Sequence, residues 1–232
     1  MGLIYCFKKH VIMIERRLMQ TEDGSATLYV PALDEHYHSV KGARAEAEHI
    51  YIEMGMMHAL GERGGEGQLR LLEVGLGTGL NALLTLERSE REGACVHYDA
   101  VELYPLTWGE IEPLGYSDAE VFRALHDSAW EEDVKLTSHF TLRKLQTDVR
   151  TVNIAPVDVI YYDAFAPEKQ PEMWTHDLME RMYDLLNPCG VLTTYCAKGV
   201  VRRMLQQVGF KVERLPGPVG GKREILRATK ER

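Results

Sequence analysis

Two acidic side chains stand where a sheet-based enzyme would place groups that do chemistry. Asp163 directly follows the strand-like run of residues 157–162, and Glu102 lies near the end of a second such run, residues 96–103. In open α/β sheets, ligands bind at the carboxyl ends of the strands. A carboxylate there can bind a hydroxyl, orient an amine or, once burial raises its pKa, accept a proton.

A glycine-rich turn precedes Glu102. The apolar run of residues 69–74 predicts a buried strand, and it ends in Gly75, Gly77 and Gly79 before a helix-like stretch. Such a turn lets backbone N–H groups face a ligand, and glycine permits both close approach and positive φ. The G-x-G-x-G spacing falls one residue short of the dinucleotide pattern G-x-G-x-x-G. It therefore favours S-adenosylmethionine, which has no pyrophosphate, over a dinucleotide.

The position of Glu102 supports a ligand that contains a nucleoside. Glu102 lies 23 residues after Gly79, close to the offset of about 20 residues at which an acid binds the ribose in such sheets. Taken singly, the glycines could form a tight turn without a ligand, and Glu102 could be a solvated strand-end carboxylate. The two features together are harder to explain by chance.

From residue 69 the sequence alternates strand-like and helix-like segments, which is the pattern of an α/β fold. The last two strands flank a Pro- and Gly-rich loop, residues 216–221, which favours an antiparallel hairpin. Residues 114–135 are acidic, lack a strand pattern and are interpreted as an insertion. A seven-stranded, mostly parallel sheet with one reversed strand is therefore expected. We expect strands near residues 69–74, 96–103, 140–146, 157–162, 190–195, 211–215 and 224–229, and helices near 79–90, 105–113, 172–186 and 199–208.

An N-terminal extension, residues 1–66, is expected to pack on a main domain of residues 67–232. Within the extension, residues 14–20 and 26–30 alternate about a turn, which predicts a β-hairpin. A helix should follow over about residues 43–60.

The segment that begins at Asp163 resembles a specific family. Residues 163–174 read Asp-Ala-Phe-Ala-Pro-Glu-Lys-Gln-Pro-Glu-Met-Trp. They are similar to the Asp-Gly-Phe-Ala-Pro-x-Lys-x-Pro-x-Met-Trp stretch of the MnmC-type methyltransferases, with Ala164 as the departure. The resemblance runs from about residue 14 to the C-terminus. Further segments that carry it are residues 37–39 with Glu46, 75–81, 201–203 with 209–210, and 221–224.

The resemblance implies a class I S-adenosylmethionine-dependent methyltransferase (Rossmann-like) fold. It implies N-methylation of the 5-aminomethyl group of (2-thio)uridine at the tRNA wobble position. The implied cofactor-binding residues are Glu73, Gly75, Gly77, Gly79, Asn81, Glu102, Asp148 and Asp163. The implied catalytic residues are Asp163, Phe165 and Lys169. The implied contacts to substrate or RNA are Tyr37, Ser39, Glu46, Arg202, Arg203, Lys222 and Arg223.

The chemistry of an aliphatic amine indicates what these residues would do. The amine must lose a proton before it attacks, so we expect Asp163 first to orient the amine and second to accept the proton. Phe165 could stack on a splayed-out base or belong to the core. Lys169 could hold the loop or a phosphate, or it could cap a solvated loop. Asp148 could contact adenine or form an Asx turn.

Two other functions are compatible with the sequence. An aminopropyltransferase of polyamine synthesis could use the same fold with a decarboxylated donor. The acidic composition permits this, although the motif of residues 163–174 argues against it. A degenerate methyltransferase fold could also serve as a non-catalytic RNA-binding subunit, which the intact glycines, Glu102 and Asp163 make less plausible.

Composition fits a cytoplasmic enzyme. The 232 residues are 45% hydrophobic and 27% charged, which is ordinary for a globular protein. The four cysteines show no paired spacing that would indicate a disulfide framework or a zinc site. No apolar run reaches membrane-spanning length, and His36, His38 and His49 lack the partners of a metal site. We therefore expect neither a membrane nor a metal.

The net charge of −8 is unexpected in a protein that holds tRNA, but the charge is uneven. Residues 198–232 contain ten Lys or Arg and three Glu, a net charge of +7, so the rest of the chain carries −15. A basic segment beside the site can bind phosphates, and tRNA is the expected partner. Many bacterial members of the family are fused to an oxidase that prepares the substrate. A separate enzyme that supplies the aminomethyl-uridine is therefore the second expected partner.

Overall fold

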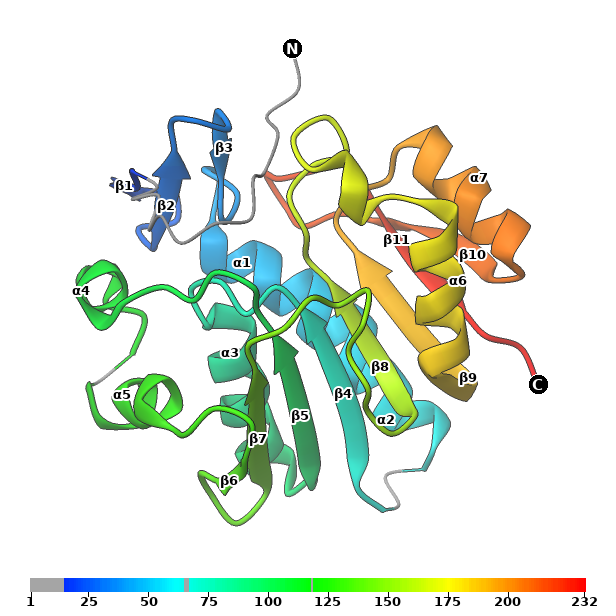
Figure 1. Cartoon of the computed structure of the whole chain (residues 1–232), viewed down its shortest axis with the longest axis horizontal. Coiled ribbons are helices and arrows are strands. Elements are labelled where there is room, and N and C mark those ends of the chain that lie inside the picture. Colours follow the sequence, from blue (N-terminus) through cyan, green and yellow to red (C-terminus); the bar gives the residue numbers. More distant parts are fainter. Residues whose placement is uncertain (1–14, 65–66, 118) are drawn as a thin grey trace.

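The computed structural model describes residues 15–64, 67–117 and 119–232. An eight-stranded sheet forms the centre of the molecule, and a smaller three-stranded sheet lies at the N-terminal side (Figure 1). In spatial order the eight strands are β10 (Lys211–Pro216), β11 (Glu224–Thr229), β9 (Leu186–Thr194), β8 (Val157–Tyr162), β4 (Leu69–Val74), β5 (Val96–Val101), β7 (Phe140–Leu145) and β6 (Asp133–Lys135).

The central strands run in one direction. Five neighbouring strands are parallel to one another: β4, β5, β7, β8 and β9. Their carboxyl ends therefore meet at one edge of the sheet. β11 is antiparallel to both β9 and β10, as the predicted hairpin requires. The α/β class is confirmed, but the predicted count of seven strands is one short, because β6 adds a second antiparallel strand beside β7. β6 has only three residues, too few to show an alternating pattern.

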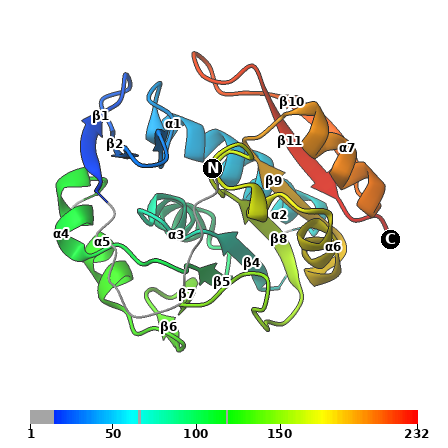
Figure 2. The ribbon, with the colours of Figure 1, turned by 45° about the horizontal axis from the view of Figure 1, so that its top comes forward.

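Helices cover the two faces of this sheet and enclose two cores (Figures 1 and 2). α3 (Leu80–Glu92) packs on one face, and α6 (His176–Leu185) and α7 (Gly199–Val208) pack on the other. Side chains alternate between the faces along each strand. Leu71 therefore belongs to the first core, and its neighbour Leu72 belongs to the second.

One continuous helix from the N-terminal part shares the face of α3. It consists of α1 (Ala43–Ala47), η1 (Glu48–Met57) and α2 (His58–Glu62), and η1 has π-type hydrogen bonding. The predicted helix over residues 43–60 is confirmed, although the sequence did not indicate its π-type centre. Gly55 lets it lie close to the sheet, since a Cβ there would be 3.0 Å from the ring of Tyr161. This contact brings one side of the helix to the carboxyl ends of the strands.

The small sheet joins β1 (Arg17–Gln20), β2 (Ala26–Val30) and β3 (Glu35–His36). β1 and β2 form the predicted hairpin. Its predicted first residue, Ile14, lies outside the described residues, as do all residues before it. Arg16, just before β1, pairs with Glu110 of α4 (Trp108–Ile111) at 2.6 Å. The N-terminal part is thereby tied to the main sheet's helices.

Several boundaries differ from the predicted ones. The helix expected near residues 105–113 is only α4 followed by the short turn η2 (Glu112–Leu114). The helix expected from residue 172 begins as the turn η3 (Pro171–Met173) and continues as α6. The segment interpreted as an insertion contains α5 (Ala119–Asp127) and β6. Residues 146–156, between β7 and β8, contain no helix.

Candidate active site

The turn between β4 and α3 is shaped for close approach of its backbone. Gly75, Gly77 and Gly79 have φ values of 89°, 50° and 75°, a region that side chains rarely adopt. A Cβ on Gly77 would lie 3.1 Å from the ring of Tyr37, and a Cβ on Gly79 would lie 2.7 Å from Nε2 of His126. The glycines thus let this turn, a cradle beside the start of α3, pack tightly against Tyr37 and His126, and Gly77 borders a pocket. A strand, a glycine turn and a helix start in this order fit a nucleoside ligand such as S-adenosylmethionine.

Glu102 follows β5 and turns toward this cradle. Its Oε2 accepts the N–H of Gly77 at 3.0 Å, and its Oε1 accepts the N–H of Tyr104 at 2.8 Å. Each carboxylate oxygen keeps capacity for another donor. Glu102 and Gly77 also line a pocket of about 130 Å³. The acid predicted to bind ribose therefore lies beside the glycine turn.

Asp163 lies at the carboxyl end of β8 and contacts the long N-terminal helix. Its Oδ1 accepts the hydroxyl of Tyr51 at 2.6 Å, and its Oδ2 accepts Nδ2 of Asn81 at 2.9 Å. Loss of solvent around the carboxyl raises its pKa to about 7 although these two hydrogen bonds lower it; Glu46 raises the pKa further and Lys222 lowers it. A carboxyl with this pKa can orient an amine as a carboxylate and can accept a proton near neutral pH.

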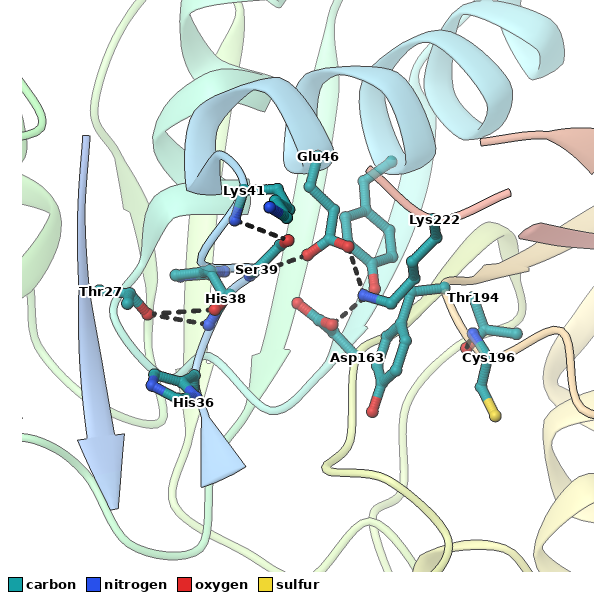
Figure 3. Close-up of polar contacts among 12 residues, drawn as sticks. Thr27, His36, His38, Ser39, Lys41, Glu46, Asp163, Thr194, Cys196 and Lys222 are labelled. Carbon is teal, nitrogen blue, oxygen red and sulfur yellow. Dashed lines mark hydrogen bonds and ion pairs between the residues drawn. The ribbon is translucent and has the colours of Figure 1, made fainter. Parts of the chain in front are cut away.

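A charged cluster lies beside Asp163 (Figure 3). Glu46 of α1 is 8% exposed. Its Oε2 accepts the N–H of Ser39 at 3.0 Å, and its Oε1 pairs with Nζ of Lys222. The same Nζ lies 4.3 Å from the ring centroid of Tyr195. Ser39, Glu46 and Lys222, all predicted to contact substrate or RNA, are thus brought together next to Asp163.

The loop after Asp163 is fastened at both ends of the family-like motif. Nε1 of Trp174 donates to the carbonyl oxygen of Phe165 at 2.7 Å. The Phe165 ring lies edge-on to Tyr37, with centroids 5.2 Å apart, and Nζ of Lys169 lies 3.5 Å from Oδ2 of Asp34. These residues hold the loop against the N-terminal part. Stacking of Phe165 on a base and phosphate binding by Lys169 stay predictions.

Two residues expected at the cofactor have other partners. Glu73 is fully buried beside Tyr98 and Asn81, and burial raises its pKa well above the usual range. Burial therefore favours the neutral form of this carboxyl. Asp148 accepts the backbone N–H of Arg150 at 2.9 Å and also pairs with its guanidinium. This is the Asx-turn alternative, and an adenine contact stays a prediction.

The remaining predicted RNA contacts lie elsewhere. Arg202 and Arg203 are in the first half of α7, and Arg223 is exposed in the β10–β11 loop. Among the described residues, no hydrogen bond or ion pair joins these three to Asp163.

Sequence reasoning missed two tyrosines of the site. Tyr51 lies within an apolar helical run, where an aromatic residue reads as core, and no local signal marks it. Tyr195, whose hydroxyl donates to the carbonyl oxygen of Ala164 at 2.9 Å, directly follows the end of β9. The strand-end argument that selected Asp163 would have selected Tyr195 as well.

Two of the three histidines considered as metal ligands, His38 and His49, form ordinary hydrogen bonds through their rings. Nε2 of His38 lies 2.6 Å from Oγ1 of Thr78, and Nε2 of His49 lies 2.8 Å from the carbonyl oxygen of Pro216. Burial lowers the pKa of His38 to about 4. Across the described ranges, no helix is both long and apolar enough to cross a membrane.

Comparison with known proteins identifies the fold and the family. Residues 119–231 match the model of a family described as S-adenosyl-L-methionine-dependent methyltransferase. The tRNA 5-methylaminomethyl-2-thiouridine biosynthesis bifunctional protein MnmC of Pseudomonas fluorescens is 32% identical over 214 residues, which cover 84% of this chain and 32% of that protein. The protein of the same name from Chromobacterium violaceum is 34% identical over 175 residues, 68% of this chain and 26% of that protein. The matches therefore span between about a quarter and a third of the length of these relatives.

A solved structure shares the fold. The crystal structure of MnmC2 from Aquifex aeolicus has a TM-score of 0.74 and 24% sequence identity, and the match covers 94% of this chain and 71% of that chain. In open α/β sheets, ligands bind at the carboxyl ends of the strands, and the glycine cradle, Glu102 and Asp163 lie at that edge. The family match, the relatives and the shared fold agree that this chain is an MnmC-type, S-adenosyl-L-methionine-dependent methyltransferase domain.

Proposed function

We propose that this chain transfers a methyl group from S-adenosylmethionine to the 5-aminomethyl group of (2-thio)uridine at the wobble position of tRNA. The observation that carries the proposal is the meeting of the cofactor cradle and Asp163. A Cβ on Gly75 would lie 3.8 Å from the carbonyl oxygen of Asp163, and Asn81, in the first turn of α3, donates to the Asp163 carboxyl. The MnmC relatives, which are named for the biosynthesis of 5-methylaminomethyl-2-thiouridine in tRNA, support the choice of substrate.

The protein's main task in this reaction is alignment. S-adenosylmethionine supplies an electrophilic methyl group that is bonded to a sulfonium sulfur. As the C–N bond forms, the C–S bond breaks and the sulfur leaves as a neutral thioether. Holding the amine in line with that bond is worth several orders of magnitude in rate. Two donors, Tyr51 and Asn81, fix the Asp163 carboxyl, so it can hold the amine in one orientation.

Proton removal is the second task. An alkyl amine in water has a pKa of about 10, like a lysine, so the substrate arrives largely as an ammonium. The Asp163 carboxyl, with a pKa of about 7, accepts a hydrogen bond from the amine and can take up the proton that the ammonium loses. After the proton has gone, the nitrogen lone pair attacks the methyl group.

The proposal also implies partners. tRNA is the substrate, and the protein acts in the cytoplasm, where tRNA is found. Since this chain matches about a third of the bifunctional relatives, a further activity, on this polypeptide or on another, is proposed to supply the aminomethyl form.

The test uses tRNA that carries 5-aminomethyl-2-thiouridine. After incubation with S-adenosylmethionine, the tRNA is digested and its nucleosides are analysed by mass spectrometry. We expect one methyl group to be added at the aminomethyl nitrogen. A parallel reaction with decarboxylated S-adenosylmethionine and a polyamine tests aminopropyl transfer. Aminopropyl products, or cofactor binding without any methylation of the tRNA, would contradict the proposal.

A further inference from the structure

The Asp163 carboxylate presents a difficulty for the proposed reaction. A negative charge beside the substrate stabilises the ammonium form, which has no lone pair and cannot attack. A second charge of opposite sign near the same amine would offset this effect. Lys222 provides such a charge, since its ammonium acts on the Asp163 carboxyl and lowers its pKa.

The hairpin between β10 and β11 holds Lys222 in place. The N–H of Gly217 donates to the carbonyl oxygen of Arg223 at 3.0 Å, which closes the base of the loop. A Cβ on Gly217 would lie 1.8 Å from the carbonyl oxygen of Lys222, so only glycine permits this approach. His49 of the long helix binds the carbonyl oxygen of Pro216 at 2.8 Å. The loop is thus fixed both to itself and to the N-terminal helix.

The side chain of Lys222 is held as firmly as its backbone. Its Nζ pairs with the buried carboxylate of Glu46 (Figure 3) and lies over the ring of Tyr195. Removal of one member of such a pair leaves a buried charge unpaired, so the pair persists in the folded protein. The ammonium is therefore a fixed charge at the site.

The surrounding groups show how far this charge reaches. Burial lowers the pKa of His38 and raises that of Cys196, and in each case the ammonium of Lys222 adds a smaller lowering. Glu46 acts in the opposite direction on Asp163. Tyr51 and Tyr195 contribute neutral hydroxyls, because burial raises the pKa of each far above neutral pH. The charged groups facing Lys222 are thus Glu46 and Asp163, and the neutral ones are His38, Cys196, Tyr51 and Tyr195.

We infer that Lys222 acts on the substrate amine, where its fixed ammonium disfavours protonation of the amine held by Asp163 and so increases the fraction that can attack. The inference rests on the proposed function. The proton passes from the substrate ammonium to Asp163 or to water, and the nitrogen keeps its electron pair for the C–N bond. Lys222 itself neither gains nor loses a proton. Its part differs from phosphate binding, the role expected from sequence, because the side chain is directed toward Glu46.

The experiment measures single-turnover methyl transfer to tRNA carrying 5-aminomethyl-2-thiouridine across pH 6 to 9. In Lys222→Met, the midpoint of the rate profile should move up by about one pH unit, the order expected for a unit charge several ångströms away. Lys222→Arg keeps the charge and should keep the midpoint.

A control and a second variant complete the design. Arg214→Met removes an exposed cation of the same hairpin, paired with Glu224, and should leave the profile unchanged. If Lys222→Met does not fold, Glu46→Gln replaces it and should move the midpoint down. A lower plateau with an unmoved midpoint in Lys222→Met would overturn the inference. Absence of methyl transfer by the unaltered protein would instead refute the proposed function on which the inference rests.

Discussion

Replacement of Asp163 by Asn should stabilise the protein, and increasingly so as the pH rises. The carboxyl has a pKa of about 7 in the folded protein against an ordinary 3.8. Between these values the folded protein holds a proton that the unfolded chain has already lost. The free energy of unfolding therefore falls as pH increases through this window. An amide at this position keeps the shape and carries no charge to desolvate. Its oxygen can still accept the Tyr51 hydroxyl, and its NH2 can donate to Oδ1 of Asn81 once the Asn81 amide flips.

The magnitude follows from the same two pKa values. A difference of about 3 units corresponds to about 4 kcal/mol at pH 8, and to almost nothing at pH 4. For a chain of this length, 1 kcal/mol shifts the melting temperature by about 2–4 °C. Asp163→Asn should therefore melt roughly 10 °C above the unaltered protein at pH 8, with the difference shrinking toward pH 4.

Thermal unfolding without S-adenosylmethionine, followed by circular dichroism at pH 5, 6, 7 and 8, measures this difference. Asp184→Asn is the matched control, because Asp184 is an exposed carboxyl on α6. It should change the melting temperature little and equally at each pH. A difference for Asp163→Asn that is flat over this range, or that decreases as pH rises, would show that the carboxyl is not desolvated and would remove the basis for its role as proton acceptor.

Three further outcomes are expected. Gly77→Val should abolish the rise in melting temperature that S-adenosylmethionine causes, since a side chain there meets Tyr37. The control Gly61→Val, where a Cβ meets nothing within 4 Å, should preserve that rise. An equal loss of the rise in both variants would refute the role of the cradle in cofactor binding. Asp163→Asn should reduce methyl transfer steeply while cofactor affinity, measured by calorimetry, changes little; equal losses would mean that Asp163 mainly holds the cofactor. Arg223→Ala should weaken tRNA binding and reduce the dependence of log K on log salt by about one unit, and an unchanged slope in filter binding would exclude a phosphate contact.

The cofactor side of the site could be predicted from sequence because it depends on neighbours in the chain. β4, the glycine turn and the start of α3 follow one another within residues 69–81, and their geometry is set by backbone conformation. Asp163 follows β8 directly, and parallel strands bring both positions to one edge. Local order along the chain was therefore enough to place these groups together.

On the amine side, the family resemblance named Glu46 and Lys222 as substrate contacts, but their pairing and the part played by Tyr51 could not be predicted, because they depend on contacts distant in sequence. Glu46 and Lys222 are 176 residues apart and meet only after the long helix and the last hairpin have packed on the sheet. Lys222 lies in a glycine-rich loop, which reads as exposed, and Glu46 lies in a short helical turn rich in charge. Tyr51 reads as one more core aromatic. Nothing local distinguishes these side chains from surface or core residues elsewhere in the chain.

Residues 198–232, the basic C-terminal segment, show why a net charge counted from sequence overestimates the number of cations available to bind RNA. Lys222 is directed toward Glu46, and Nζ of Lys230 donates to two backbone carbonyl oxygens. Arg227 pairs with Glu213 at 3.0 Å across the hairpin. These three cations stabilise the fold or the site and are not available to phosphates. The contacts to tRNA must then come from the cations that stay exposed, so they should be few, and the affinity should depend on salt less steeply than a net charge of +7 would require. Under the proposed function, a protein that binds its RNA through few phosphate contacts gains its specificity at the modified base, where we propose that Asp163, Glu46 and Lys222 act.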